Sequence, residues 1–139
     1  MLSHLGSKAI IFAVLSFLSV SQISIAQASS VRDLREKCAL VLDITNSKNR
    51  QTTDEELLNA GVCIGQMIAE IRWRNTLCAL YESTGEQILQ EFGRKMFYMD
   101  AGQTAQAFVN WANNNPELWN KDLFDIEVQQ SMFSKYNCK

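Results

Sequence analysis

The sequence predicts an all-α protein, a small irregular antiparallel bundle of four to five helices with two disulfides. Three observations indicate this fold class. The chain has six glycines and one proline in 139 residues. No stretch alternates valine, isoleucine and threonine as a half-buried strand would. Apolar residues recur instead three and four positions apart, which is the spacing of one helix face.

The first residues have the three-part layout of a cleavable secretory signal. Lys8 precedes an apolar run from Ala9 to Val20, and a polar stretch then ends at Ala28 among small residues. A retained membrane anchor is the alternative, but this run has about 12 residues and a spanning helix needs about 20. We therefore expect a signal peptide over residues 1–28, one mature periplasmic domain over residues 29–139, and no membrane contact after cleavage.

Capping residues mark the first two helices of the mature chain. Ser30 is the expected start of a helix that runs to about Asp43, and Thr53 with Glu56 forms the pattern of a capping box. The second helix is expected to bury one continuous stripe, which consists of Ala60, Cys63, Ile64, Met67 and Ile71. The sequence leaves open whether this helix runs on toward Leu80 or breaks near Asn75.

Two more helices are expected in the middle of the chain. A short one should begin near Thr84 and end at Gly93, which we expect to be a left-handed stop. Asp100 with Gln103 then resembles another cap, and the helix after it should end before Pro116.

The last helix is expected to begin at Asn115-Pro116-Glu117, because proline is tolerated in a first helical turn. Its expected inner face has four members, namely Leu123, Ile126, Gln130 and Phe133.

Four cysteines lie in the mature part, and an even count in an exported chain predicts two disulfides. A zinc site is disfavoured, because structural zinc sites use close cysteine pairs and these cysteines are separated by 24, 14 and 59 residues. We favour Cys38 with Cys63, since both lie on the apolar faces of helices joined by one loop, and Cys78 with Cys138. The rival pairing of Cys38 with Cys138 and Cys63 with Cys78 stays open.

The mature chain is expected to lack histidine, the residue on which many catalytic mechanisms depend. Its expected cleavage removes His4, the single histidine, and with it triad chemistry and histidine-ligated zinc. The acidic pairs Glu55/Glu56 and Asp122/Asp125 are better explained by a helix start and a polar face. We therefore expect a protein that is not an enzyme, with no catalytic residues, cofactor or metal.

Charge and aromatic content bear on the kind of partner. Loss of Lys8 leaves 12 basic against 15 acidic side chains, a net charge of −3, which argues against nucleic acid. Core packing explains Trp111 best. Trp73, Tyr98 and Trp119 are expected near helix ends or in loops, where an aromatic ring is either core or an anchor of a protein interface.

Short motifs along the mature chain carry a resemblance to a known family. They are Cys38 in a helix, Cys63-Ile64-Gly65, Gln103, Phe108-Val109, Trp111, Asn115-Pro116-Glu117 and a terminal Cys138. This pattern resembles the Rap/Tai family of periplasmic immunity proteins, in which Gly65, Gln103, Trp111 and Pro116 would be structural. The resemblance implies a disulfide-bonded inhibitor of a peptidoglycan amidase toxin delivered by type VI secretion.

One departure from the family pattern concerns the second disulfide. Many members have Cys-x-Pro where this chain has Met99-Asp100-Ala101, and Cys78 lies much earlier. The second disulfide and the loop before Asp100 are therefore expected to differ from the family's. A periplasmic stress chaperone or another non-catalytic binding protein is the alternative function, and a homodimer is left open.

We predict that the exported protein contains no free thiol and loses much of its thermal stability on reduction. Intact-mass analysis after alkylation without reductant should show no added mass on the denatured protein. Near-stoichiometric labelling would contradict the two-disulfide assignment.

Overall fold

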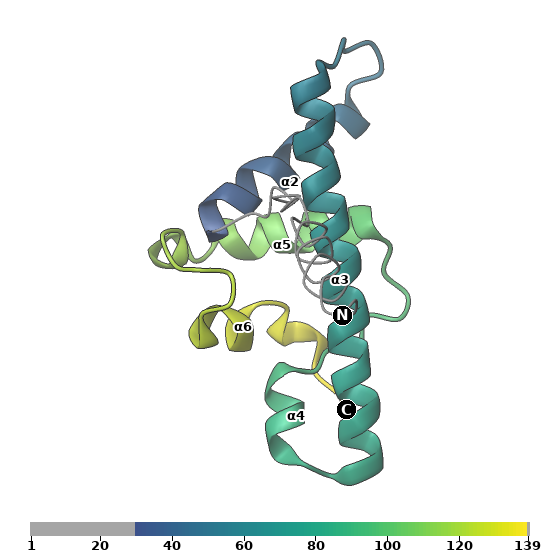
Figure 1. The fold of residues 1–139 in the computed structure, drawn as a ribbon, viewed down its shortest axis with the longest axis vertical. Helices are drawn as coiled ribbons and strands as arrows, with labels where there is room; N and C mark the ends of the chain where they lie inside the picture. Colours follow the sequence, from purple (N-terminus) through teal and green to yellow (C-terminus); the bar gives the residue numbers. More distant parts are fainter. Residues whose placement is uncertain (1–29, 139) are drawn as a thin grey trace, which may run out of the picture.

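Residues 30–138 are described by a computed structural model, which is all-helical in its regular elements. In chain order these are α2 (Val31–Asn46), α3 (Asp54–Thr84), α4 (Gln87–Phe92), α5 (Ala101–Asn113), η2 (Pro116–Leu118), α6 (Ile126–Ser131) and η3 (Ser134–Tyr136). The predicted all-α class is confirmed, with five α-helices in the described range (Figure 1). The expected signal peptide, residues 1–28, lies outside that range.

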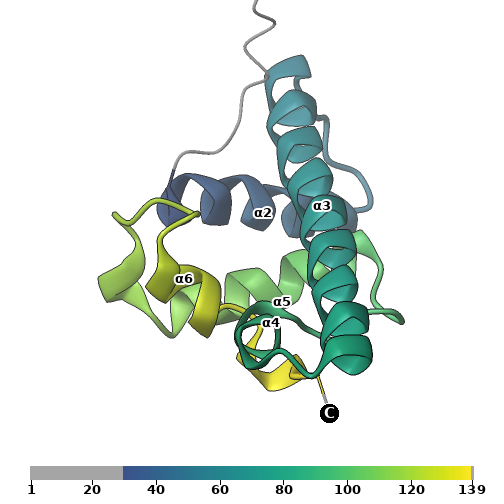
Figure 2. The same cartoon turned by 60° about the horizontal axis from the view of Figure 1, so that its bottom comes forward.

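Helix α3 is the longest element, and α2, α4 and α5 all pack against it. It has 31 residues, so it is about 46 Å long at 1.5 Å per residue. Its start is the predicted capping box, with the Thr53 side chain accepting from the Glu56 amide and the Glu56 side chain from the Thr53 amide. Helices α2 and α5 pack across its first half, and α4 folds back along its second half (Figures 1 and 2).

The open question about a break near Asn75 is settled in favour of one continuous helix. Asn75 is buried, and its side-chain oxygen accepts a hydrogen bond of 2.7 Å from the backbone amide of Met96. The asparagine that weakens the helical pattern thus attaches the helix to the segment after α4.

The predicted left-handed stop at Gly93 is wrong, because the residue has φ −68°. The left-handed cap is Gly85, with φ 74°, at the end of α3. Gly93 is needed for another reason: a Cβ atom there would lie 2.7 Å from the Cys138 sulfur and 2.9 Å from the Cys78 amide nitrogen.

The prediction of one last helix from Pro116 is also wrong. Pro116 opens only the three-residue turn η2, and α6 has six residues. Of the expected inner face, Leu123 and Phe133 are buried while Ile126 and Gln130 are exposed. The helix breaks between η2 and α6 and again at Phe133, which has φ 58°, so one 3.6-residue period does not extend over the segment. Buried instead are Val128, Gln129 and Met132.

Both predicted disulfides are confirmed. Cys38–Cys63 joins α2 to α3, and Cys78–Cys138 joins α3 to the chain end, so the rival pairing is wrong. All four cysteines are buried and none is free. In the chain-entropy description, a disulfide that closes a loop of this size stabilises the fold by about 3 to 4.5 kcal/mol.

We predict that Gly93→Ala lowers the free energy of unfolding by about 1 to 3 kcal/mol, because the added methyl meets backbone atoms and a disulfide sulfur. Gly61→Ala is the matched control, since it lies within α3 with open space above it and should gain about 0.5 to 1 kcal/mol. Urea unfolding of both variants measures the difference. Equal stabilities would show that the close approach at Gly93 is not limiting.

Candidate functional site: an aromatic groove

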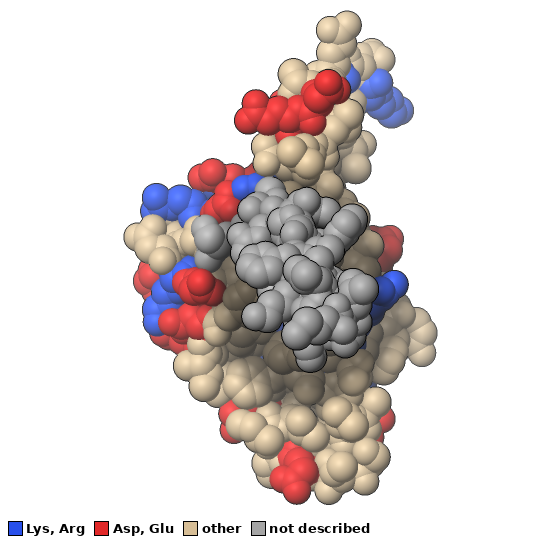
Figure 3. Space-filling model, viewed as in Figure 1, with Lys and Arg blue, Asp and Glu red and all other residues tan. Residues whose placement is uncertain are grey.

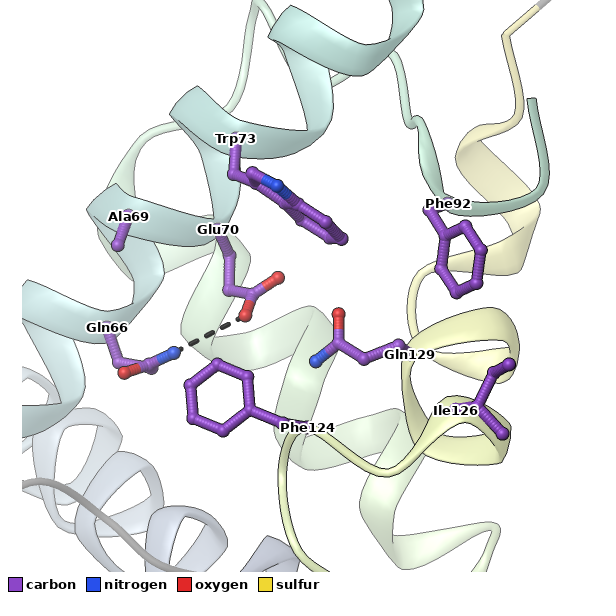
Figure 4. Close-up of a pocket in the computed structure, with 8 residues that line it drawn as sticks. All are labelled: Gln66, Ala69, Glu70, Trp73, Phe92, Phe124, Ile126 and Gln129. Atoms are coloured by element: carbon purple, nitrogen blue, oxygen red, sulfur yellow. Dashed lines mark hydrogen bonds between the residues drawn. The ribbon is translucent and has the colours of Figure 1, made fainter. Parts of the chain in front are cut away.

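A groove of about 660 Å³ lies between α3, α4 and α6, and we call it the aromatic groove. Eight residues line it, namely Gln66, Ala69, Glu70, Trp73, Phe92, Phe124, Ile126 and Gln129 (Figure 4). Volumes of roughly 300 to 1,000 Å³ are usual for ligand sites.

The walls of the groove are apolar side chains in contact with solvent. Trp73 is 44% exposed, Phe124 65% and Ile126 64%. On α3 the lining residues are three and four positions apart and therefore share one face. Trp73 also faces Phe92 of α4, with ring centroids 6.5 Å apart. Clustered exposed rings of this kind mark interaction sites more often than single exposed apolar residues do.

The floor of the groove is a buried polar network centred on Arg74. Its Nε donates to Glu70 Oε2 at 2.8 Å, and one terminal nitrogen donates to Gln129 Oε1 at 3.0 Å. The other terminal nitrogen donates to the backbone oxygens of Phe92 and Gln129. The side-chain nitrogen of Gln129 in turn donates a hydrogen bond of 2.6 Å to the backbone oxygen of Leu123. One guanidinium thus joins α3 to α4 and α6.

Burial lowers the pKa of Arg74, and the neighbouring Glu70 carboxylate acts in the opposite direction. The side chain is fully buried, so its charge depends on that carboxylate and on the carbonyls around it. Removing one partner of such a pair leaves an uncompensated buried charge, which is much more costly than the pair is stabilising.

A second buried arginine, Arg94, closes the end of α4. One of its terminal nitrogens donates to the backbone oxygens of Glu91 at 2.8 Å and Gly93 at 2.6 Å. The other terminal nitrogen donates to the backbone oxygen of Gln130 at 2.6 Å. Its Nε has no hydrogen-bond partner among the described residues. Burial, and then the nearby Arg74 cation, lower the pKa of Arg94 to about 10. Arg94 thus connects the carboxyl-terminal ends of α4 and α6 through hydrogen bonds.

The three aromatic residues predicted as core or interface fall in different places. Trp73 lies in the groove wall. Tyr98 is 99% exposed but lies outside the groove, in the segment before α5. Trp119 is half-buried, donates from Nε1 to the Ala112 oxygen at 2.7 Å, and has the Arg35 guanidinium 4.7 Å from its ring centroid.

The residues of the family pattern lie away from the groove. Gly65 is an exposed residue of α3, and Gln103 completes the capping box of α5 with Asp100. Trp111 is half-buried with its ring 5.7 Å from that of Phe108, and Pro116 is the first residue of η2. None of these four lines the aromatic groove.

Sequence reasoning missed most of the groove. Glu70 and Arg74 are four residues apart on a helix, a spacing typical of solvent-exposed pairs. Ile126 was expected to be buried. Trp73 is the lining residue that the sequence marked as a possible interface anchor, with core packing as the alternative.

Charged side chains outside the groove are spread over the described surface. On the face shown in Figure 3, acidic and basic groups gather at the tip of α3 and along one edge, while much of the lower part is uncharged. Within residues 30–138, no three histidine, cysteine, aspartate or glutamate residues are grouped to hold a metal. Over the same residues, no helix has the length and apolar character needed to cross a membrane.

Comparison of the chain with protein-family models, with curated proteins and with solved structures finds no match.

We predict that Arg74→Met lowers the free energy of unfolding by about 3 to 5 kcal/mol, because Glu70 is left charged and buried. Arg72→Met, at an exposed position of the same helix, should change it by about 0.5 kcal/mol or less. Adding Glu70→Gln to Arg74→Met should recover part of the loss. Chemical denaturation measures all three, and a loss below about 1 kcal/mol for Arg74→Met would contradict the role of the network.

Proposed function

We propose that this protein is a non-catalytic, exported binding protein that docks onto a protein partner through its aromatic groove. The observation that carries the proposal is the exposure of Trp73, Phe124 and Ile126 around one hollow. Binding energy at protein interfaces concentrates in aromatic and apolar anchors seated in such pockets. Apolar side chains exposed to water are unfavourable in the free protein, and a partner that covers them would gain the free energy of their burial.

The compartment follows in part from the disulfides, which indicate an oxidising, exported environment. The periplasm is the finer proposal, and it rests on the secretory signal that the sequence predicts over residues 1–28. In that compartment disulfides form and persist, because thiols are not kept reduced there as they are in the cytosol.

Rigidity supports an inhibitory role. The groove is formed by α3, α4 and α6, and these are connected by the Arg74 network and the Cys78–Cys138 disulfide. A surface that is already ordered loses little conformational entropy on binding, so more of the contact energy appears as affinity. An inhibitor that must occupy an enzyme for long periods benefits from this arrangement.

The identity of the partner comes from the family resemblance. We propose that the partner is a peptidoglycan amidase toxin of a type VI secretion system, and that this protein protects its own cell as an immunity protein. The groups shielded in the amidase would be its catalytic cysteine and histidine. Loss of histidine with the predicted signal peptide is consistent with a protein that inhibits rather than hydrolyses.

We predict that the exported protein binds the amidase encoded nearest its gene at micromolar concentration or below, blocks hydrolysis, and hydrolyses no peptidoglycan itself. Phe124→Ser should weaken binding about 30-fold, the loss expected of one anchor residue. Phe97→Ser is the matched control, because Phe97 is 60% exposed and lies outside the groove.

Titration calorimetry of the wild type and both variants is the measurement. Absence of heat with the wild type would contradict the immunity proposal for that amidase. Equal loss in Phe124→Ser and Phe97→Ser would place the docking surface elsewhere on the molecule.

A further inference from the structure

Glu70 gives the aromatic groove a hydrogen-bond acceptor at its floor. Its Oε2 accepts from Arg74 at 2.8 Å, while Oε1 accepts a long bond of 3.3 Å from the Gln66 amide. Figure 4 shows the carboxylate directed into the hollow between the rings of Trp73 and Phe124. A carboxylate has about four acceptor positions, so Glu70 retains acceptor capacity on the side that faces the groove.

Two of the other polar side chains at the floor, Arg74 and Gln129, already have hydrogen-bond partners, and Gln66, which also lines the groove, donates to Glu70. Gln129 accepts from Arg74 with its side-chain oxygen and donates to Leu123 with its nitrogen. Arg74 donates from all three of its nitrogens. Glu70 is therefore the charged acceptor at the floor, and the walls contribute mainly apolar and aromatic surface. Sites of this composition bind a ligand with an apolar body and one correctly placed polar group.

Charge decides between a cationic and a neutral donor. Arg74 already neutralises Glu70, and Arg94 is a second buried cation near Arg74. A lysine or arginine head group entering the groove would meet this excess of positive charge behind the carboxylate. A neutral hydroxyl donor gains the hydrogen bond without that repulsion and without the desolvation cost of an ion.

We propose that the aromatic groove binds a tyrosine side chain of the protein partner, with the ring between Trp73 and Phe124 and the phenolic hydroxyl donating to Glu70 Oε1. This inference rests on the proposed function, because it takes the groove as the docking surface. Tyrosine combines a large rigid apolar ring with a polar tip, and it is enriched at interface centres for that reason.

Small phenols test the proposal without the partner. Nuclear magnetic resonance titration of the full exported chain, followed at the Trp73 indole, compares p-cresol, toluene and 4-methylanisole. All three have the methyl-bearing ring, but p-cresol alone has a hydroxyl donor. We expect p-cresol to bind about tenfold tighter than the other two, as a hydrogen bond to a carboxylate implies. Phe124→Ser should abolish the shifts, and Phe97→Ser should leave them unchanged.

Several outcomes would overturn the proposal. Equal affinity for p-cresol and toluene would mean that the groove recognises only the apolar part of a ligand, as a lipid-binding site would. Failure of all three probes at millimolar concentration would mean that the groove is not an aromatic site. Shifts at Trp73 that depend on protein concentration and vanish in Tyr98→Ala would assign the groove to the exposed tyrosine of a second copy.

The probe experiment and the amidase experiment fail independently. An amidase that binds wild type tightly and Phe124→Ser weakly, together with no preference for p-cresol, would leave the docking surface in place and remove the tyrosine. Preference for p-cresol with no amidase binding would keep the groove chemistry and remove the amidase.

Discussion

The guanidinium of Arg74 is the interaction on which the shape of this molecule depends. It is fully buried and hydrogen-bonds to side chains or backbone atoms of three different helices. Apolar packing alone would not fix α4 and α6, which have six residues each and are too short to be stable helices on their own. A planar group with five donors can set the distance and orientation of both at once. The hydrogen bonds of this group connect the helices on the two sides of the groove.

The same network explains why the exposed rings of the groove coexist with a stable fold. Buried polar groups are costly unless they are hydrogen-bonded. The acceptors for Arg74 are backbone carbonyls near the ends of two short helices, the Glu70 carboxylate and the Gln129 side-chain oxygen. Those carbonyls have no partner within their own helices. The arginines therefore satisfy helix ends that would otherwise require water, and the interior beneath the groove is polar while its rim is apolar.

Local sequence signals predicted the helix starts and the disulfides well. The capping boxes at Thr53 and Asp100 and the cap at Ser30 form as expected, because each depends on atoms within three residues. The pairing of Cys38 with Cys63 followed from two adjacent apolar faces. The course of the chain after Pro116 did not follow from its pattern, because long-range contacts there override helical periodicity.

The groove itself was beyond sequence reasoning, because its two sides are far apart in the chain. The bond between Arg74 and Gln129 joins residues 55 positions apart, and nothing in a single sequence links them. Glu70 and Arg74 have the spacing of a surface pair, and Ile126 has the chemistry of a core residue, yet the first two are buried and the last is exposed. Only the topology that brings α6 onto α3 reverses both expectations.

The positions of the two disulfides along α3 divide the described chain into two covalent rings. One ring spans residues 38–63 and includes the connection between α2 and α3, and the other spans residues 78–138 and includes every later connection. A protease that cuts one bond in any of these connections opens a ring but releases no fragment. Between the rings, residues 63–78 form uninterrupted α-helix, which proteases cleave poorly because they bind extended chain. A single cut in any of these connections should therefore leave the chain from Cys38 to Cys138 in one covalent piece.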